Sequence, residues 1–161
     1  MADLIPAIRN AARALIIREQ KVLLLRKQYE TGLQRYTLPG GGQDVGESLQ
    51  QALQRECLEE IGTSVEIGTL LHVADFFKLK DTQPPTRRHL VEFVFECKIT
   101  ADYQPQNGHR PDKHQVEVIW ANLHEAAQLP LYPQFLSTCM THQQGERRPH
   151  YLGVFHDHAT A

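Results

Sequence analysis

Apolar residues gather in short runs or alternate with polar residues along most of this chain, which predicts a structure built mainly from β-strands. Two nearly continuous apolar runs, 11–17 and 22–25, are separated by four polar residues. Runs of this kind are typical of strands that are buried on both faces, and the short connection between them predicts a hairpin. A short strand is expected over 35–38, immediately before a run of glycines.

Two longer strands are expected in the middle of the chain. Residues 64–80 are rich in apolar positions, and Gly68 marks a point where a bulge or bend would fit. Residues 88–99 alternate between two faces of a strand. A proline-containing loop over 81–86 joins the two segments, which together predict an antiparallel hairpin.

One segment has the spacing of a helix. Ser48 can serve as the N-cap, Gln51 completes a capping box, and Gly62 can end the helix in a left-handed conformation. The helix is therefore expected over 49–61. Apolar residues recur every four positions on one face, which predicts that this face is buried; these residues are Leu49, Leu53, Cys57 and Ile61.

The last third of the chain predicts shorter elements. In order they are a loop over 101–113, a strand over 116–121, helices over 123–129 and 134–141, an exposed polar segment over 143–149, and a final strand over 151–155. The tail, 156–161, is expected to be disordered. Strands on both sides of a helix, with further helices late in the chain, predict an α/β sandwich around a mixed β-sheet.

Length and composition limit what the protein can be. The 161 residues can bury a core, and no repeat or linker divides them, so one domain is expected over 1–161. No apolar run is long enough to cross a membrane, and the N-terminus lacks the pattern of a signal peptide. The net charge of −2 gives no general attraction to nucleic acid or anionic membranes.

The cysteines indicate a reducing environment. Cys57, Cys97 and Cys139 are widely spaced and show no C-x-x-C pattern. We expect reduced thiols in or near the core of a cytoplasmic protein, rather than disulfides or a structural zinc site.

Three glutamates lie together on the helix, away from its apolar stripe. Glu56 and Glu60 are one turn apart, and Glu59 lies beside both. Arg55 can pair with Glu59 but cannot balance three carboxylates. Such a cluster suits Mg²⁺ or Mn²⁺, with a solvated acidic face as the simpler alternative. The glycines at 40–42 would let a phosphate approach the backbone, whose N–H groups could form an anion nest. The pairing indicates metal-assisted chemistry on phosphates.

These residues resemble the signature of the Nudix hydrolase family, the Nudix box. Every fixed polar and glycine position of the box is present at the family's spacing: Gly41, Glu47, Arg55, Glu56, Glu59, Glu60 and Gly62. Two positions that are usually aliphatic hold Cys57 and Thr63. The residues before the box are similar to the family's strand into the loop, with Tyr36 where Trp is common. The Nudix fold has the same sandwich plan that the pattern of elements predicts.

The resemblance implies roles for the matched positions. Arg55 would orient the catalytic carboxylates, and Glu47 would brace the loop against the helix through an ion pair. Glu59 would be a metal ligand or the partner of a metal-bound water. Mg²⁺, or Mn²⁺ in its place, would be bound by oxygens of Glu56, Glu60, Glu59 and the carbonyl of Gly40.

The general base stays open at this point, because family members differ in where it lies. Glu56 is one choice. Asp112, His114 and Glu117 lie shortly before Trp120, where a late acid often falls in the family, although each is also readable as a surface residue. Glu117 is the expected further metal ligand or base.

Substrate contacts are expected from the glycine loop and the nearby strands. Gly41 and Gly42 would approach phosphate oxygens. Tyr36 could stack on a base, although an aromatic residue in a strand is also a normal core residue. Arg26 could contact a phosphate, with a solvent-facing strand end as the alternative.

The resemblance implies hydrolysis of a pyrophosphate bond in a nucleoside diphosphate linked to another group. The region 76–80 has none of the marks that distinguish substrate classes in the family. One alternative is a Nudix-like module that senses a nucleotide without catalysis, and another is an isomerase on the same fold; the intact box argues against both. A homodimer is common in this fold. No nucleic acid or membrane partner is expected.

Overall fold

The first strand, β1 (Asp3–Arg18), carries both halves of the sheet in the computed structural model, which describes residues 3–141 and 149–157. It pairs in parallel with β6 (Thr86–Lys98) along most of its length and antiparallel with the short strand β4 (Gly40–Gly42). Its pairing with β2 (Lys21–Gln28) is limited to two residue pairs at the hairpin, Ile17 with Val22 and Arg18 with Lys21. The two strands of the predicted hairpin therefore separate soon after the turn.

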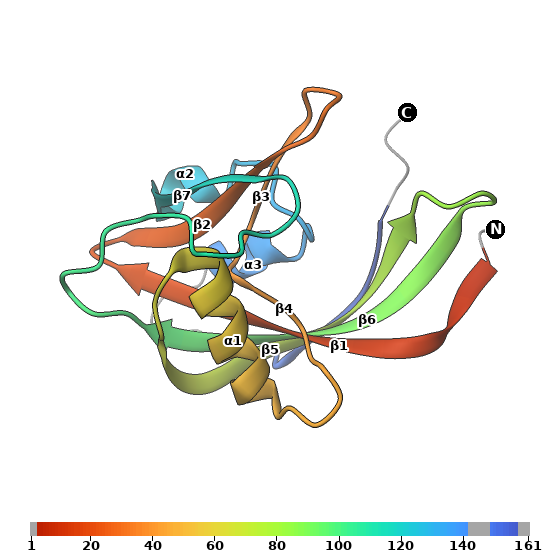
Figure 1. Cartoon of the computed structure of the whole chain (residues 1–161), viewed down its shortest axis with the longest axis horizontal. Helices are drawn as coiled ribbons and strands as arrows, with labels where there is room; N and C mark the ends of the chain where they lie inside the picture. Colours follow the sequence, from red (N-terminus) through yellow and green to blue (C-terminus); the bar gives the residue numbers. More distant parts are fainter. Residues whose placement is uncertain (1–2, 142–148, 158–161) are drawn as a thin grey trace.

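That separation divides the sheet into two parts. The second strand, β2, pairs with β3 (Gln34–Thr37) and β7 (Gln115–Asn122). On the other side of β1, β6 pairs with β5 (Glu66–Lys80), and β5 pairs with β8 (Tyr151–His156). The strand order is β3-β2-β1-β6-β5-β8, with both parallel and antiparallel neighbours. Figure 1 shows β1, β5 and β6 extending together beyond the rest of the molecule.

Helices cover the two faces of the sheet. The long helix α1 (Leu49–Ile61) packs on one face, and the short helices α2 (Leu123–Ala126) and α3 (Leu136–Met140) pack on the other. Neighbouring residues on β1 contribute to different cores: Ile16 packs with α1, and Leu15 packs with α2 and α3. The expected mixed sheet between layers of helices is confirmed, and double-sided burial explains the continuous apolar runs.

The signals for α1 are borne out at both ends. Ser48 and Gln51 form the full capping box, and Gly62 has the left-handed conformation that ends the helix, with φ 74°. Three residues of the apolar stripe are fully buried, and Leu49 packs at the edge of the same core; the three are Leu53, Cys57 and Ile61.

Other predicted boundaries differ from the structure. Strand β1 starts at Asp3 instead of residue 11, and the glycines at 40–42 form a strand rather than a loop. The late helices are shorter than predicted. The tail was expected to be disordered from residue 156, but His156 lies in β8 and the Asp157 N–H donates to the Phe77 carbonyl. Residues 158–161, and 143–148 of the polar segment, lie outside the described residues.

The cysteines agree with the sequence reading. Cys57, Cys97 and Cys139 are reduced thiols, and all three are buried. Burial raises the pKa of the Cys97 thiol to about 12, which keeps it protonated at neutral pH. Within the described part of the chain, no helix has the length and apolar character needed to cross a membrane.

Candidate active site

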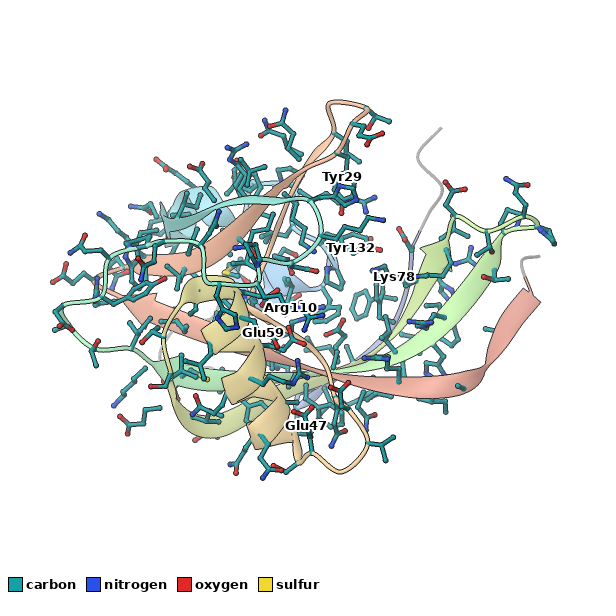
Figure 2. The ribbon with its side chains drawn as sticks, in the orientation of Figure 1. Tyr29, Glu47, Glu59, Lys78, Arg110 and Tyr132 are labelled. Atoms are coloured by element: carbon teal, nitrogen blue, oxygen red, sulfur yellow. The ribbon has the colours of Figure 1, made fainter. Side chains whose placement is uncertain are left out.

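The acidic side of α1 lines a polar cavity of about 440 Å³. The capped start of the helix follows the glycine strand directly, so β4 and the carboxylates of α1 lie next to each other. Figure 2 marks Glu47 just before the helix and Glu59 towards its end. Besides the three predicted glutamates, the lining includes four cations and two further acids: Arg9, Arg55, Arg110, Lys113, Asp44 and Asp112.

Glu60 is the most deeply placed of the three glutamates, with 1% of its surface exposed. Its Oε1 accepts a 2.7 Å hydrogen bond from the backbone N–H of Gly40. Its Oε2 is buried and has no hydrogen-bond partner among the described residues. Burial, together with the nearby carboxylates of Asp112 and Glu56, raises the pKa of Glu60 to about 8, although the Gly40 N–H opposes the rise.

Arg55 neutralises the other two glutamates. Its Nη1 donates to Glu56 at 2.8 Å and lies 3.5 Å from a carboxylate oxygen of Glu59, which is the predicted i,i+4 pair. Burial nevertheless raises the pKa of Glu56, and the nearby Glu59 adds to the rise. The structure therefore brings Glu56 and Glu59 to one arginine, whereas Glu60 beside them is bound by the Gly40 N–H.

The predicted brace between loop and helix is present. Arg55 binds both carboxylate oxygens of Glu47, at 2.8 Å and 3.0 Å, and donates to the Gly42 carbonyl at 2.9 Å. Glu47 also accepts the N–H of Asp44. The hydrogen bonds from Arg55, and then from Asp44, lower the pKa of Glu47 to about 2. One guanidinium thus links the glycine strand, the loop and two carboxylates of the helix.

A second buried arginine supports the glycine strand, and the sequence analysis missed it. Arg13 in β1 forms a 3.0 Å ion pair with the buried Glu92 in β6 and donates to the Gly40 carbonyl at 3.0 Å. The Gly40 carbonyl, expected to bind the metal, is thus a hydrogen-bond acceptor here. The signal that would have revealed the pair is a charge flanked by apolar residues in each strand: Arg13 in an apolar run, and Glu92 between Leu90 and Val94 on one face.

Glycine is required at one position of β4, and at the next it leaves room for the carboxylate of Glu56. A Cβ at Gly40, whose φ is 136°, would lie 2.0 Å from the Ala12 carbonyl oxygen. A Cβ at Gly41 would lie 2.7 Å from the Glu56 carboxyl carbon. The glycines therefore allow the strand to approach both β1 and the carboxylates. The Gly40 N–H is engaged by Glu60, so it is not part of an open anion nest.

Of the three late residues considered as base or ligand, the structure brings Asp112 to the carboxylates. Asp112 lines the cavity and lies close enough to Glu60 to raise its pKa. It forms an ion pair with Lys27 in β2. Burial raises the pKa of Asp112, but Lys27 outweighs that effect and the net pKa is lowered, so Asp112 stays ionised near neutral pH.

Glu117, the preferred further ligand, lies elsewhere. It pairs with Arg26 at 2.7 Å across β2 and β7, and neither residue lines the carboxylate cavity. The Arg26 charge is therefore used by Glu117 rather than directed at a phosphate. Tyr36 packs against the core beneath α2 and α3. His114 lines a neighbouring cavity and lies against Tyr29. These positions depart from the predicted site because their partners come from distant strands.

The residues fit a divalent cation by their chemistry. In the described ranges, no three Asp, Glu, His or Cys side chains are already arranged as a metal site. The buried Glu60 Oε2, however, has no partner, and an uncompensated buried carboxylate is unfavourable unless it is protonated or neutralised. A hard cation bound by carboxylate oxygens satisfies this requirement. Glu60, Glu56, Glu59 and Asp112 are donors within the cavity lining that could contribute, whereas Asp44, also in the lining, is largely exposed and lies 3.7 Å from both Arg9 and Arg55.

The chain was compared with known families and proteins. The family model described as the NUDIX domain matches residues 7–141. An ADP-ribose pyrophosphatase of Methanocaldococcus jannaschii is 32% identical over 90 residues, which are 56% of this chain and 49% of that protein. The Bacillus subtilis protein YjhB, whose name provisionally gives the same activity, is 30% identical over 103 residues, 64% of this chain and 47% of that protein. The chain thus spans about half the length of these curated relatives.

Solved structures also resemble this fold. A NUDIX hydrolase from Nitrosomonas europaea superposes with a TM-score of 0.69 at 22% identity, covering 92% of this chain and 79% of that one. At this level of identity the likeness is evidence about the fold alone. It agrees with the sandwich of helices and mixed sheet described above.

Proposed function

This chain belongs to the Nudix family, and from that premise we propose that it is a divalent-metal-dependent pyrophosphohydrolase acting on a nucleoside diphosphate linked to a second group. The observation that carries the proposal is the buried carboxylate of Glu60, with one oxygen on the Gly40 N–H and the other without a partner. Its position beside Glu56, Glu59 and Asp112 suits Mg²⁺ or Mn²⁺ and a diphosphate.

The protein's own residues prepare the cavity for this reaction. Glu60, Glu56 and Glu59 would hold the metal, with Asp112 as a further ligand in place of the predicted Glu117. Arg55 holds Glu56 in position and, through Glu47 and the Gly42 carbonyl, fixes the glycine strand relative to the helix. A bound cation would neutralise phosphate oxygens and lower the pKa of a bound water.

Metal binding and the arginine would compete for the same carboxylates. Arg55 donates to Glu56 at 2.8 Å and lies near Glu59. Its stronger, two-point attachment is to Glu47, which stays available when the other carboxylates bind a cation. Arg55 can therefore release Glu56 without leaving the site.

A general base must accept a proton from the attacking water. Glu56 fits this role because burial raises its pKa toward the working range of a base. Asp112 is less suited to accepting a proton, since its pKa is lowered and Lys27 already engages it. We therefore assign Glu56 as the base and Asp112 as the further ligand.

The proposal is tested by a product-release assay with the full chain. Nucleoside triphosphates, oxidised nucleotides, ADP-ribose, nucleotide sugars and dinucleoside polyphosphates are incubated with and without Mg²⁺ or Mn²⁺. Hydrolysis of one class into two phosphate products, only with metal, is the expected result. Silence across the panel from folded protein would instead favour the nucleotide-sensing module, which calorimetry would reveal as binding without product.

The name of one relative indicates which compound to assay first. The Methanocaldococcus jannaschii relative is named for ADP-ribose hydrolysis, and ADP-ribose is a nucleoside diphosphate linked to a sugar. A cytoplasmic location and a homodimer remain predictions from the sequence.

A further inference from the structure

A second cavity, of about 600 Å³, adjoins the carboxylate cavity. Asp112 and Lys113 line both, so the two cavities border the same two residues. We call the second space the cationic pocket. Its positive side chains come from four separate segments of the chain and are Lys27, Arg35, Lys78, Lys80 and Lys113.

Few of these charges are neutralised within the protein. Lys27 pairs with Asp112. For the other four cations, no carboxylate of the described residues lies within ion-pair distance: Arg35, Lys78, Lys80 and Lys113. Asp157 also lines the pocket, but it accepts hydrogen bonds from the Tyr132 hydroxyl at 2.8 Å and the Leu79 N–H at 3.2 Å.

The tyrosines of the pocket are already in contact with protein groups. The Arg35 guanidinium lies 4.1 Å from the Tyr132 ring centre and 5.4 Å from that of Tyr29. Tyr132 also meets Phe76 edge-on, and Tyr29 lies against His114. These contacts leave less aromatic surface for stacking a neutral base. They also hold the guanidinium so that its N–H donors are pre-organised for an anion.

The lysines of the pocket repel one another. Burial, together with the nearby cations Lys80, Arg13 and Lys27, lowers the pKa of Lys78 to about 8. Burial and the neighbouring Arg88 and Lys113 also lower the pKa of Lys80. The Lys78 Nζ lies 5.9 Å from the ring centre of Tyr132, and Figure 2 labels these two residues near each other. An anion bound here would relieve the crowding and replace water around a half-buried lysine.

We propose that the cationic pocket binds a phosphate carried by the substrate in addition to the pyrophosphate that is hydrolysed. The carboxylate cavity would position the scissile diphosphate at a bound cation, and the cationic pocket, which borders the same Asp112 and Lys113, would take another part of the molecule. The preferred substrate is therefore a phosphorylated derivative of a nucleoside diphosphate compound, rather than one whose second group is neutral. This inference rests on the proposed hydrolysis.

Matched substrates test the inference. ADP-ribose is compared with ADP-ribose 1″-phosphate, which carries the extra phosphate on the second group, and NADH with NADPH, which carries it on the adenosine. At least a tenfold higher kcat/KM for one phosphorylated member is expected, and the pair that shows it identifies the end of the substrate in the pocket. Equal kcat/KM within both pairs would overturn the proposal.

Substitutions in the cationic pocket test whether this pocket causes the preference for a phosphorylated substrate. Lys78→Gln and, as a second variant, Arg35→Lys should lower kcat/KM for the preferred phosphorylated substrate at least fivefold more than for its unphosphorylated partner. Lys98→Gln is the matched control, because Lys98 is an exposed lysine at the end of β6 that lines neither cavity. A loss that is equal for both substrates of a pair would contradict the assignment.

A binding measurement separates this inference from the proposed function. Inorganic pyrophosphate is titrated into the full chain by calorimetry in EDTA, so that no metal or turnover is needed. Wild type and Lys98→Gln should bind it alike, and Lys78→Gln at least fivefold more weakly. If wild type does not bind pyrophosphate, or if Lys78→Gln binds it equally well, the proposed phosphate site is wrong even when hydrolysis is found. Binding without any hydrolysis supports the phosphate site and contradicts the proposed enzymatic function.

Discussion

The Gly40 backbone N–H donates a 2.7 Å hydrogen bond to one carboxylate oxygen of Glu60, and the other oxygen of Glu60 is buried without a partner among the described residues. The glycine strand thus donates a hydrogen bond to one oxygen of the Glu60 carboxylate and leaves the other oxygen without one. That combination is expected of a metal ligand whose cation completes the site, because a buried carboxylate without compensation is unfavourable.

Glu60 should make the metal-free protein less stable as the pH rises. Its pKa in the folded protein is about 8, above the ordinary 4.5, so the folded state retains a proton that the unfolded state loses. The free energy of unfolding should therefore fall between pH 4.5 and 8 and level off above that range. Thermal unfolding in EDTA measures this slope. Glu60→Gln should flatten it and melt several °C higher than wild type at pH 8, since roughly 2–4 °C corresponds to each kcal/mol.

Bound Mg²⁺ should make wild type the more stable of the two proteins at pH 8. Mg²⁺ binds the ionised carboxylate, so millimolar Mg²⁺ should raise the melting temperature of wild type at pH 8 but leave Glu60→Gln nearly unchanged. The same scans with NaCl at matched ionic strength control for general effects of ions. An equal rise in both proteins would show that the cation binds away from Glu60.

Asp112 and Glu117 can be separated directly. Asp112 lines the carboxylate cavity, whereas Glu117 pairs with Arg26 outside it. Asp112→Asn should lower Mg²⁺-dependent turnover about tenfold or more, and Glu117→Gln less than about twofold. Lys27→Met removes the Asp112 ion pair but retains the carboxylate; because Lys27 also lines the cationic pocket, this control is compared by the Mg²⁺ concentration for half-maximal activity rather than by turnover. If Lys27→Met were as harmful as Asp112→Asn, the role of Asp112 would be structural.

The Glu47 brace should affect the metal more than the fold. Glu47→Gln keeps the shape but weakens the two-point contact with Arg55, whose other hydrogen bonds orient Glu56 and the glycine strand. We expect the Mg²⁺ concentration for half-maximal activity to rise about tenfold, as for other residues that orient ligands. Circular dichroism and melting temperature should change little. If the Mg²⁺ requirement of Glu47→Gln were unchanged, the contact with Glu47 would not be what orients Arg55 toward Glu56.

The buried pair between Arg13 and Glu92 should be a major source of stability. Arg13 is largely buried and Glu92 is 1% exposed, so removing either partner leaves the other uncompensated. Glu92→Gln or Arg13→Met should each lower the free energy of unfolding by about 3 kcal/mol. The double variant should lose less than the sum of the two, which a double-mutant cycle from denaturant unfolding measures. Additive losses would mean that the pair is not coupled.

The sequence predicted most successfully where local signals dominate. Ser48, Gln51 and Gly62 act within the helix they bound, so the limits of α1 could be placed from the sequence. The two buried faces of β1 and β2 follow equally from their unbroken apolar runs. The glycines at 40–42 gave no strand signal, because their pairing depends on β1, and glycine itself has low strand propensity.

The long-range contacts that shape the site could not be predicted from local sequence signals. Arg13 meets Glu92 across 79 positions of sequence, and Lys27 meets Asp112 across 85. Each pair depends on which strands become neighbours, and alternation along one strand carries no information about that choice. Glu117 was a reasonable ligand by position in the chain, but its place in β7 opposite Arg26 directs it to another partner.

The central claim is that Glu60 binds the catalytic metal, and one comparison tests it most directly. Turnover of the best substrate from the panel is measured for wild type and Glu60→Gln at pH 8 over a Mg²⁺ titration. We predict that wild type requires the metal and that Glu60→Gln is slower by about 10³-fold at saturating Mg²⁺, equivalent to roughly 4 kcal/mol in the barrier. A folded Glu60→Gln variant with wild-type turnover and the same Mg²⁺ dependence would contradict the account.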